Sequence, residues 1–151
     1  GVKSHNTVQF DSHEQMPRLS RFLLGAWLKS HIKEDFLREK KSIKVGYKDR
    51  FNCEHIRNVC LNENKLTIID TLSGFQESAV LRWRLIAADW VLNNQTLSSS
   101  LAEMRISSDV IIKRIELVKG YESRYYYQES ELPVLEVEIE ASGTIATEIN
   151  F

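Results

Sequence analysis

The sequence predicts an all-β protein, an antiparallel β-sandwich of about 11 to 12 strands. Three observations support this fold class. Apolar and polar residues alternate with a period of two over most of the chain, turn-forming residues recur about every eight to twelve positions, and helical periodicity is scarce. With 151 residues, the chain is long enough to form one domain with its own core.

The clearest strand pattern is "PVLEVEIEA", residues 133–141. Apolar and acidic side chains take opposite faces in it, with Leu135, Val137 and Ile139 against Glu136, Glu138 and Glu140. This alternation is typical of a half-buried antiparallel strand whose acidic face meets solvent. The other expected strands are "NTVQF", "RFLLGAWLKSHI", "AVLRWRLIA", "DVIIKRIELV" and "ESRYYYQ".

A hairpin is expected at residues 59–72, because two β-rich runs flank the turn-forming "NEN". Gly74 then ends the second strand. Asp70 follows the apolar run "LTII" on its inward face, so we expect its carboxylate to be buried at least in part. A buried carboxylate needs a partner, and His55 or Arg57 across the hairpin can supply one.

One segment has a different composition. "HIKEDFLREKKS" is rich in helix formers, so a short helix near residues 31–40 is expected as an alternative to a strand or an irregular charged excursion.

Charge and apolar content limit the classes of partner. The formal net charge of −1 gives no overall positive field that would attract nucleic acid or an anionic membrane. No apolar run approaches the roughly 18 to 20 residues that span a bilayer. Cys53 and Cys60 could form a disulfide only across a tight turn, so both are expected to be free thiols.

Potential metal ligands lie near the start of the chain, at His5, Asp11 and His13. On one extended strand they would share a face but span more than about 20 Å, which is too far for one ion. The simpler interpretation is a polar loop with solvated histidines.

Aromatic and basic residues offer a second kind of site. In a strand, Tyr125 and Tyr127 would point one way, as residues that line a sugar-binding groove do, although tyrosines are also ordinary strand residues. Arg82 and Arg84 would share the outer face of their strand. They could bind carboxylates or sulfates, or pair with the glutamates of a neighbouring strand.

Four stretches resemble heparinase II/III-like polysaccharide lyases, and they follow one another along the chain in the order found in that family. "SHNTVQFD" resembles the "HNT" segment of that family, "LRWRLIAADW" its W-x-L strand, and "GYESRYYYQESELPVLEVEIEASGTIATEI" its closing segment. "EHIRNVCLNENKLTIIDTLSG" resembles a His-x-Arg strand, a hairpin, a strand ending in Asp and a following Gly, which correspond here to His55, Arg57, Asp70 and Gly74. We expect these four residues to have structural roles.

The resemblance implies that residues 1–151 form the C-terminal β-sandwich of a longer lyase, in which an α/α-toroid precedes the sandwich region. The family cleaves uronate-containing, anionic polysaccharides by β-elimination. Its base and acid, typically Tyr and His, come from upstream elements, so no catalytic residue is expected in this chain. A periplasmic or secreted location of the parent protein is expected on the same basis.

The resemblance also implies a metal ligand at His5, with zinc or calcium completed by upstream residues, so this chain alone is expected to bind no metal. His13 lies outside the family pattern. Arg84 stands where relatives often have His, and with Tyr125 and Tyr127 it forms our predicted substrate-binding set. The edge at residues 5–11 is expected to be exposed, unpaired and apolar, which would favour a dimer.

Two other functions fit the same residues. The chain could be a carbohydrate-binding module that uses Tyr125 to Tyr127 with Trp83 or Trp90 as stacking platforms. It could also be a structural support domain that makes protein–protein contacts.

Overall fold

The protein is a two-sheet antiparallel β-sandwich, described here from a computed structural model that covers residues 1–151 except 22, 38, 40 and 124. The described elements are a 3-10 turn, η1 (Val2–Ser4), and the strands β1 (Val8–Phe10), β2 (Lys29–Leu37), β3 (Ser42–Lys48), β4 (Glu54–Asn62), β5 (Lys65–Ser73), β6 (Ala79–Arg84), β7 (Val91–Asn93), β8 (Thr96–Ser98), β9 (Glu103–Ser108), β10 (Ile112–Glu122), β11 (Ser130–Ile139) and β12 (Gly143–Asn150). The predicted all-β sandwich is therefore confirmed.

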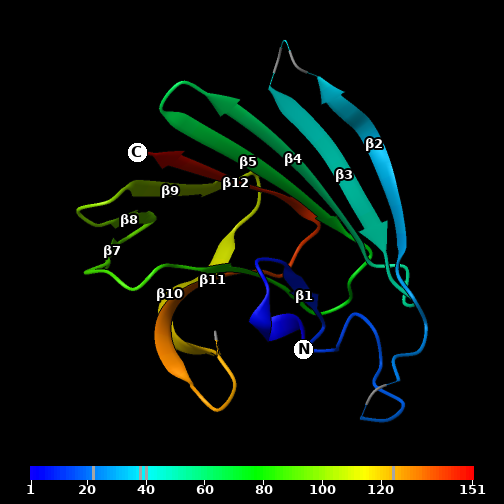
Figure 1. Ribbon diagram of the computed structural model, residues 1–151. Helices are drawn as coiled ribbons and strands as arrows, with labels where there is room; N and C mark the ends of the chain where they lie inside the picture. Colours follow the sequence, from blue (N-terminus) through cyan, green and yellow to red (C-terminus); the bar gives the residue numbers. More distant parts are fainter. Residues whose placement is uncertain (22, 38, 40, 124) are drawn as a thin grey trace.

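The two sheets differ in size. The larger has eight strands in the order β2-β3-β4-β5-β12-β9-β8-β7, and the smaller has four in the order β1-β6-β11-β10. Figure 1 shows them stacked, with the β2 and β3 end of the larger sheet extending past β1. The core lies between them and includes Leu72, Leu81, Leu135, Val137, Ile139 and Ile145, all fully buried.

The alternation predicted for the acidic strand is present in β11. Its outward-facing glutamates meet basic residues of the neighbouring strands, with Arg82 Nε 2.7 Å from Glu136 and Arg114 Nε 2.9 Å from Glu138. Arg114 also lies 2.9 Å from Glu136 through Nη2. Lys113 continues this row of ion pairs by contacting Glu140.

The expectation of a short helix near residues 31–40 is wrong for the residues that the structure describes there. Lys29–Leu37 is β2, an edge strand that pairs with β3 through register shifts near Glu34. Pairing with β3 overrides the helical propensity, and charged side chains suit an edge strand that faces water.

Two other expected strands are confirmed only in part or not at all. Of the described residues in the strand expected at 21–32, only residues 29–32 form a strand, as part of β2. Residues 23–28 lie outside the named strands, in a turn that contains an isolated bridge between Arg18 and Leu24, and residue 22 lies outside the described part. The tyrosine stretch is a loop between β10 and β11, where the Ser123 hydroxyl donates to the carbonyl of Tyr125 at 2.9 Å. Local bonds of this kind compete with strand pairing.

Candidate functional site

The site begins with a buried carboxylate on the β4–β5 hairpin. The hairpin register places Asp70 opposite Arg57 and two residue pairs away from His55, on the same face of the sheet. Asp70 is fully buried and accepts hydrogen bonds from His55 Nε2 at 2.6 Å, from Arg57 Nε at 2.7 Å and from Arg57 Nη2 at 3.2 Å. Burial alone would raise the pKa of Asp70, but the bonds from His55 and Arg57 outweigh it and lower that pKa.

Arg57 connects this carboxylate to the N-terminal segment. Its Nη1 donates to the backbone carbonyl of Asn6 at 2.8 Å, and its guanidinium lies 4.6 Å from the ring centroid of Trp83. Asn6 is held a second time, because its side-chain oxygen accepts from the backbone N–H of Arg84 at 2.7 Å. Residues of both sheets thus fix the "HNT" segment, which presents His5 to solvent.

The backbone at Gly74 requires glycine. Its φ is +84°, and an added Cβ would lie 2.4 Å from the carbonyl oxygen of Asn52. A side chain here would therefore strain the backbone and collide with the β3–β4 turn.

A metal at His5 does not fit this chain by itself. His5 is exposed, and among the described residues the group of three close potential ligands consists of His13, Asp49 and Cys53. Zinc or calcium at His5 would need further ligands besides those that the described residues bring together there, because one imidazole binds a divalent ion weakly.

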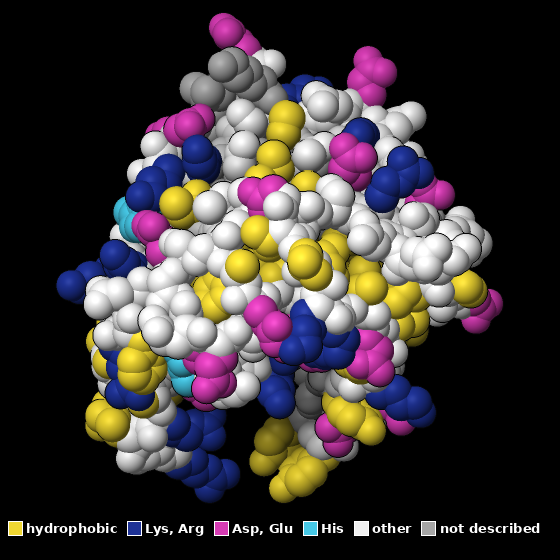
Figure 2. Space-filling model, turned by 180° about the vertical axis from the view of Figure 1, so that it is seen from behind, with side chains coloured by type: hydrophobic (Ala, Val, Ile, Leu, Met, Phe, Trp, Pro, Cys, Tyr) yellow, Lys and Arg dark blue, Asp and Glu magenta, His cyan; other side chains and the backbone are white. Residues whose placement is uncertain are grey.

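The predicted substrate-binding residues come together only in part. A shallow pocket of about 730 Å³ contains Arg84 and Tyr127, lined by Ser4, Arg84, Tyr121, Glu122, Ser123, Tyr127, Gln128 and Glu129. Tyr125 is not in this lining, although its side chain is 70% exposed nearby. The loop projects from the lower edge of the molecule in Figure 2.

The chemistry of this pocket is mixed rather than strongly basic. Arg84 donates to the carbonyls of Tyr121 at 2.6 Å and Lys3 at 3.4 Å, so its two terminal nitrogens bind backbone. Two carboxylates, Glu122 and Glu129, line the same pocket. The lining, with one arginine and two carboxylates, therefore carries no net positive charge.

Two other residues that could have contacted a substrate, Arg82 and Trp83, are buried and bonded within the sandwich. Arg82 is buried and pairs with Glu136, so pairing with a neighbouring strand is the correct alternative for this arginine. Trp83 is buried in the core, and its indole N–H donates to Thr147 at 3.1 Å. Trp83 therefore offers no exposed face on which a sugar could stack.

A second, more apolar pocket lies under the overhanging end of the larger sheet. It has a volume of about 570 Å³ and is lined by Thr7, Leu28, Ser30, His31, Ile32, Val45, Gly46, Tyr47, His55 and Arg57. The strand registers place Ile32, Val45 and Tyr47 on the inner face, continuous with Arg57. No motif in the sequence suggested this pocket, although the alternation of Ile43, Val45 and Tyr47 could have indicated an inward face.

The edge strand β1 is covered by other parts of the chain, whereas an exposed apolar edge was expected. β1 is an edge strand as predicted, but Val8, Gln9 and Phe10 are all buried. The carbonyl of Val8 accepts from Gln15 Nε2 at 3.1 Å, and that of Phe10 accepts from the N–H of His13 at 2.9 Å. Because the following loop covers this edge, the expectation of an exposed apolar edge at residues 5–11 is wrong, and nothing in the structure supports the dimer that it suggested.

Taken together, the fold and these sites define an antiparallel β-sandwich domain with a shallow, polar surface pocket and an anchored N-terminal segment. The chain belongs to the heparinase II/III-like family, whose C-terminal model matches residues 1–130. No curated protein is significantly similar to the chain in sequence. No helix among the described residues is long and apolar enough to cross a membrane.

Solved structures with the same fold include a heparinase III gene product, with a TM-score of 0.80 and 14% identity over 98% of this chain. The heparan sulfate lyase HepC from Pedobacter heparinus gives a TM-score of 0.70 and 16% identity, again over 98% of the chain. The aligned region is 24% of the length of each of these proteins, so this chain spans about a quarter of them.

Proposed function

We propose that the chain is the C-terminal β-sandwich part of a polysaccharide lyase that cleaves uronate-containing polysaccharide by β-elimination, with catalytic residues upstream of residue 1. An α/α-toroid in the same parent protein would supply most of the substrate cleft. Family membership and the heparinase III fold support this proposal.

The observation that carries the proposal is the anchoring of the "HNT" segment. A buried ion pair costs desolvation energy, and replacing it with apolar residues often stabilises a protein. Here the buried Asp70 orients Arg57, which holds the carbonyl of the exposed Asn6. A network that positions an exposed segment so firmly supports a functional role for that segment.

The tyrosine and histidine that meet beside the apolar pocket, Tyr47 and His55, have structural partners in this chain. β-Elimination needs a base for the C5 proton and an acid for the departing O4. Burial raises the pKa of Tyr47 to about 12, and its hydroxyl contacts Gln15 and Val8. His55 is buried, and its Nε2 is engaged in the hydrogen bond to Asp70. We therefore assign proton transfer to upstream residues.

A direct test compares this chain with a longer protein that includes the upstream coding sequence. Both are incubated with heparan sulfate, and unsaturated uronate products are followed by near-ultraviolet absorbance. We expect turnover only from the longer protein. If it is folded and inactive on every uronate polymer tried, the lyase proposal fails.

Two matched variants test whether the anchored N-terminal segment contributes to activity. In the active longer protein, Asn6→Ala removes the acceptor for the backbone N–H of Arg84 at an exposed position, whereas Asn62→Ala removes an exposed amide at the far end of β4. We expect Asn6→Ala to lower kcat/KM about tenfold with little change in stability, and Asn62→Ala to change neither. Equal activity of the two variants would remove the functional role of the anchored segment.

A second candidate function is a carbohydrate-binding domain, and the exposed tyrosine loop is the observation that favours it. Tyr126 and Tyr127 are 88% and 92% exposed, and their rings are in contact at the mouth of the Arg84 pocket. Large exposed aromatic rings are suited to stacking on sugars.

Affinity electrophoresis of the isolated chain in gels that contain polysaccharide tests this candidate. Binding that is lost in Tyr127→Ala and kept in Trp27→Ala, another exposed aromatic that lies outside the pocket, would favour the binding domain. Equal migration with and without polysaccharide would exclude it for the polymers tested.

A further inference from the structure

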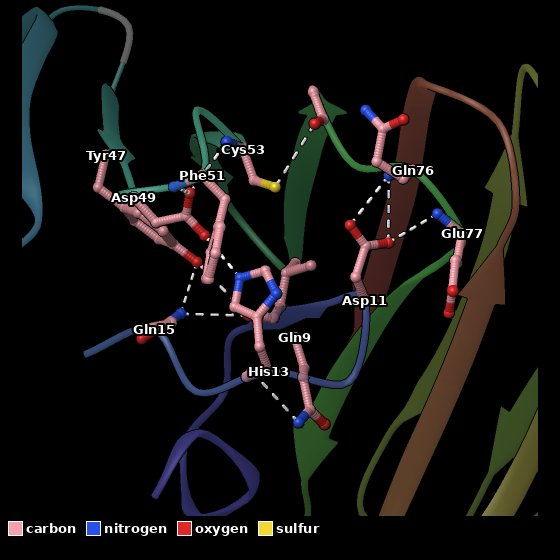
Figure 3. Close-up of polar contacts among 12 residues, drawn as sticks. Gln9, Asp11, His13, Gln15, Tyr47, Asp49, Phe51, Cys53, Gln76 and Glu77 are labelled. Atoms are coloured by element: carbon pink, nitrogen blue, oxygen red, sulfur yellow. Dashed lines mark hydrogen bonds and ion pairs between the residues drawn. The ribbon is translucent and has the colours of Figure 1, made fainter. Parts of the chain in front are cut away.

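A compact group of potential metal ligands lies apart from the two pockets and the anchored N-terminal segment. The loop after β1 supplies His13, and the β3–β4 turn supplies Asp49 and Cys53. One ligand atom from each of the three lies within 4.8 Å of the other two. Figure 3 shows the His13 ring directed at this turn. The group therefore joins a loop of the smaller sheet to a turn of the larger sheet.

The turn holds its two ligands in place. Asp49 Oδ1 accepts from the backbone N–H groups of Phe51 and Cys53, each at 2.9 Å. This leaves Oδ2 for His13 Nε2, which lies 2.8 Å away. Gly74 packs tightly against Asn52, which restrains the same turn. The carboxylate is thus oriented by backbone bonds in the way that outer-shell contacts orient metal ligands.

The position of the thiol is not explained by the His13–Asp49 hydrogen bond. Cys53 is buried, and its Sγ makes one long contact in the described structure, donating to the carbonyl of Gly74 at 3.6 Å. Burial, followed by the neighbouring Asp49, raises the pKa of Cys53 to about 11, so a metal would have to displace its proton.

We propose that His13, Asp49 and Cys53 form a binding site for a borderline-soft divalent cation, Zn²⁺, with the fourth position open to water. A nitrogen, an oxygen and a sulfur ligand match zinc, whereas calcium and magnesium need more oxygen ligands. Ligand atoms in a tetrahedral zinc site lie roughly 3 to 4 Å apart, given bonds of about 2.0 to 2.3 Å. Small side-chain shifts would bring the present atoms into that geometry.

The His13 side is the route by which an ion can enter. The side chain of His13 is 21% exposed, while that of Asp49 is fully buried. His13 packs on the ring of Phe51 at a centroid distance of 4.4 Å, which orients the imidazole over the turn. A bound ion would tie the loop that covers the β1 edge to the opposite sheet.

This site differs from the expected metal ligand His5, and it departs from the expectation that the chain alone binds no metal. Because it uses only residues of this chain, it does not depend on the lyase proposal.

Cobalt substitution tests the site directly. The purified chain is stripped with a chelator, titrated with Co²⁺ and followed by absorbance, and bound metal per chain is measured by mass spectrometry after Zn²⁺ loading. We expect one ion per chain, tetrahedral cobalt bands and a thiolate-to-cobalt charge-transfer band. A folded chain that shows no thiolate band would overturn the proposal.

Matched variants assign the ligands. Cys53→Ser should remove the thiolate band, and His13→Ala should weaken Zn²⁺ binding by about a hundredfold or more. His5→Ala and Cys60→Ser, which alter one of the other histidines and the second thiol of the chain, should change neither. Loss of binding in His5→Ala or Cys60→Ser, or full binding in His13→Ala, contradicts the assignment. If Cys53→Ser does not fold, Zn²⁺ binding by His13→Ala compared with that by His5→Ala still tests the assignment.

Discussion

Replacing Asp70 with alanine tests the buried network most directly. Asp70 accepts three hydrogen bonds from His55 and Arg57, and hydrogen bonds to charged groups contribute about 1.5 to 3 kcal/mol each. Removing one partner of a fully buried ion pair costs about 3 to 5 kcal/mol. The Arg57 side chain is 19% exposed and keeps its bond to Asn6, which reduces the penalty. We therefore expect Asp70→Ala to lower the free energy of unfolding by about 2 to 4 kcal/mol.

Urea denaturation followed by tryptophan fluorescence measures this loss, since Trp83 packs against Arg57. The control is Asp89→Ala, an exposed aspartate for which a change within about 0.5 kcal/mol is expected. An Asp70→Ala midpoint equal to that of wild type would refute the argument that this carboxylate stabilises the hairpin.

The same carboxylate gives a pH dependence. The pKa of Asp70 is lower in the folded state than its ordinary value of about 3.9, because His55 and Arg57 stabilise the charged form. Its stabilisation is therefore complete above about pH 4 and is lost as the pH falls through the folded pKa. The difference in stability between wild type and Asp70→Asn should shrink in that acidic range, and a constant difference would contradict the assignment.

Three further predictions follow from the packing and the site. Gly74→Ala should cost more than about 1 kcal/mol, because its Cβ would meet Asn52, and an unchanged urea midpoint would show that the turn can relax. Arg82→Met should cost about 2 kcal/mol, since Glu136 keeps Arg114 as a partner, whereas the exposed control Arg105→Met should be nearly neutral; equal midpoints would contradict this. The isolated chain should release no unsaturated uronate from heparan sulfate, and sustained product formation would show that it contains a base and an acid.

The contacts that could be predicted from sequence are those set by local pairing. The β4–β5 hairpin fixes its register through a two-residue turn, so the positions of His55, Arg57 and Asp70 followed from their spacing. The inward face of β11 followed from its alternation for the same reason.

Contacts between distant segments could not be predicted in this way. His13 reaches Asp49 only because the loop after β1 folds back over the β3–β4 turn, a result of how the two sheets stack. The tyrosine loop alternates like a strand, yet local bonds at Ser123 turn it. β2 has a helical composition, and its pairing with β3 decides its structure.

The row of ion pairs on the outer face of β11 has a consequence for long-range attraction. Each glutamate of the row meets a cation of an adjacent strand, so the acidic and basic charges cancel within a few ångströms. At physiological ionic strength the Debye length is about 8 Å, and a neutralised row of this kind has almost no field beyond it. A diffusing polyanion would be neither steered toward this face nor repelled by it, and its rate of approach should depend little on added salt.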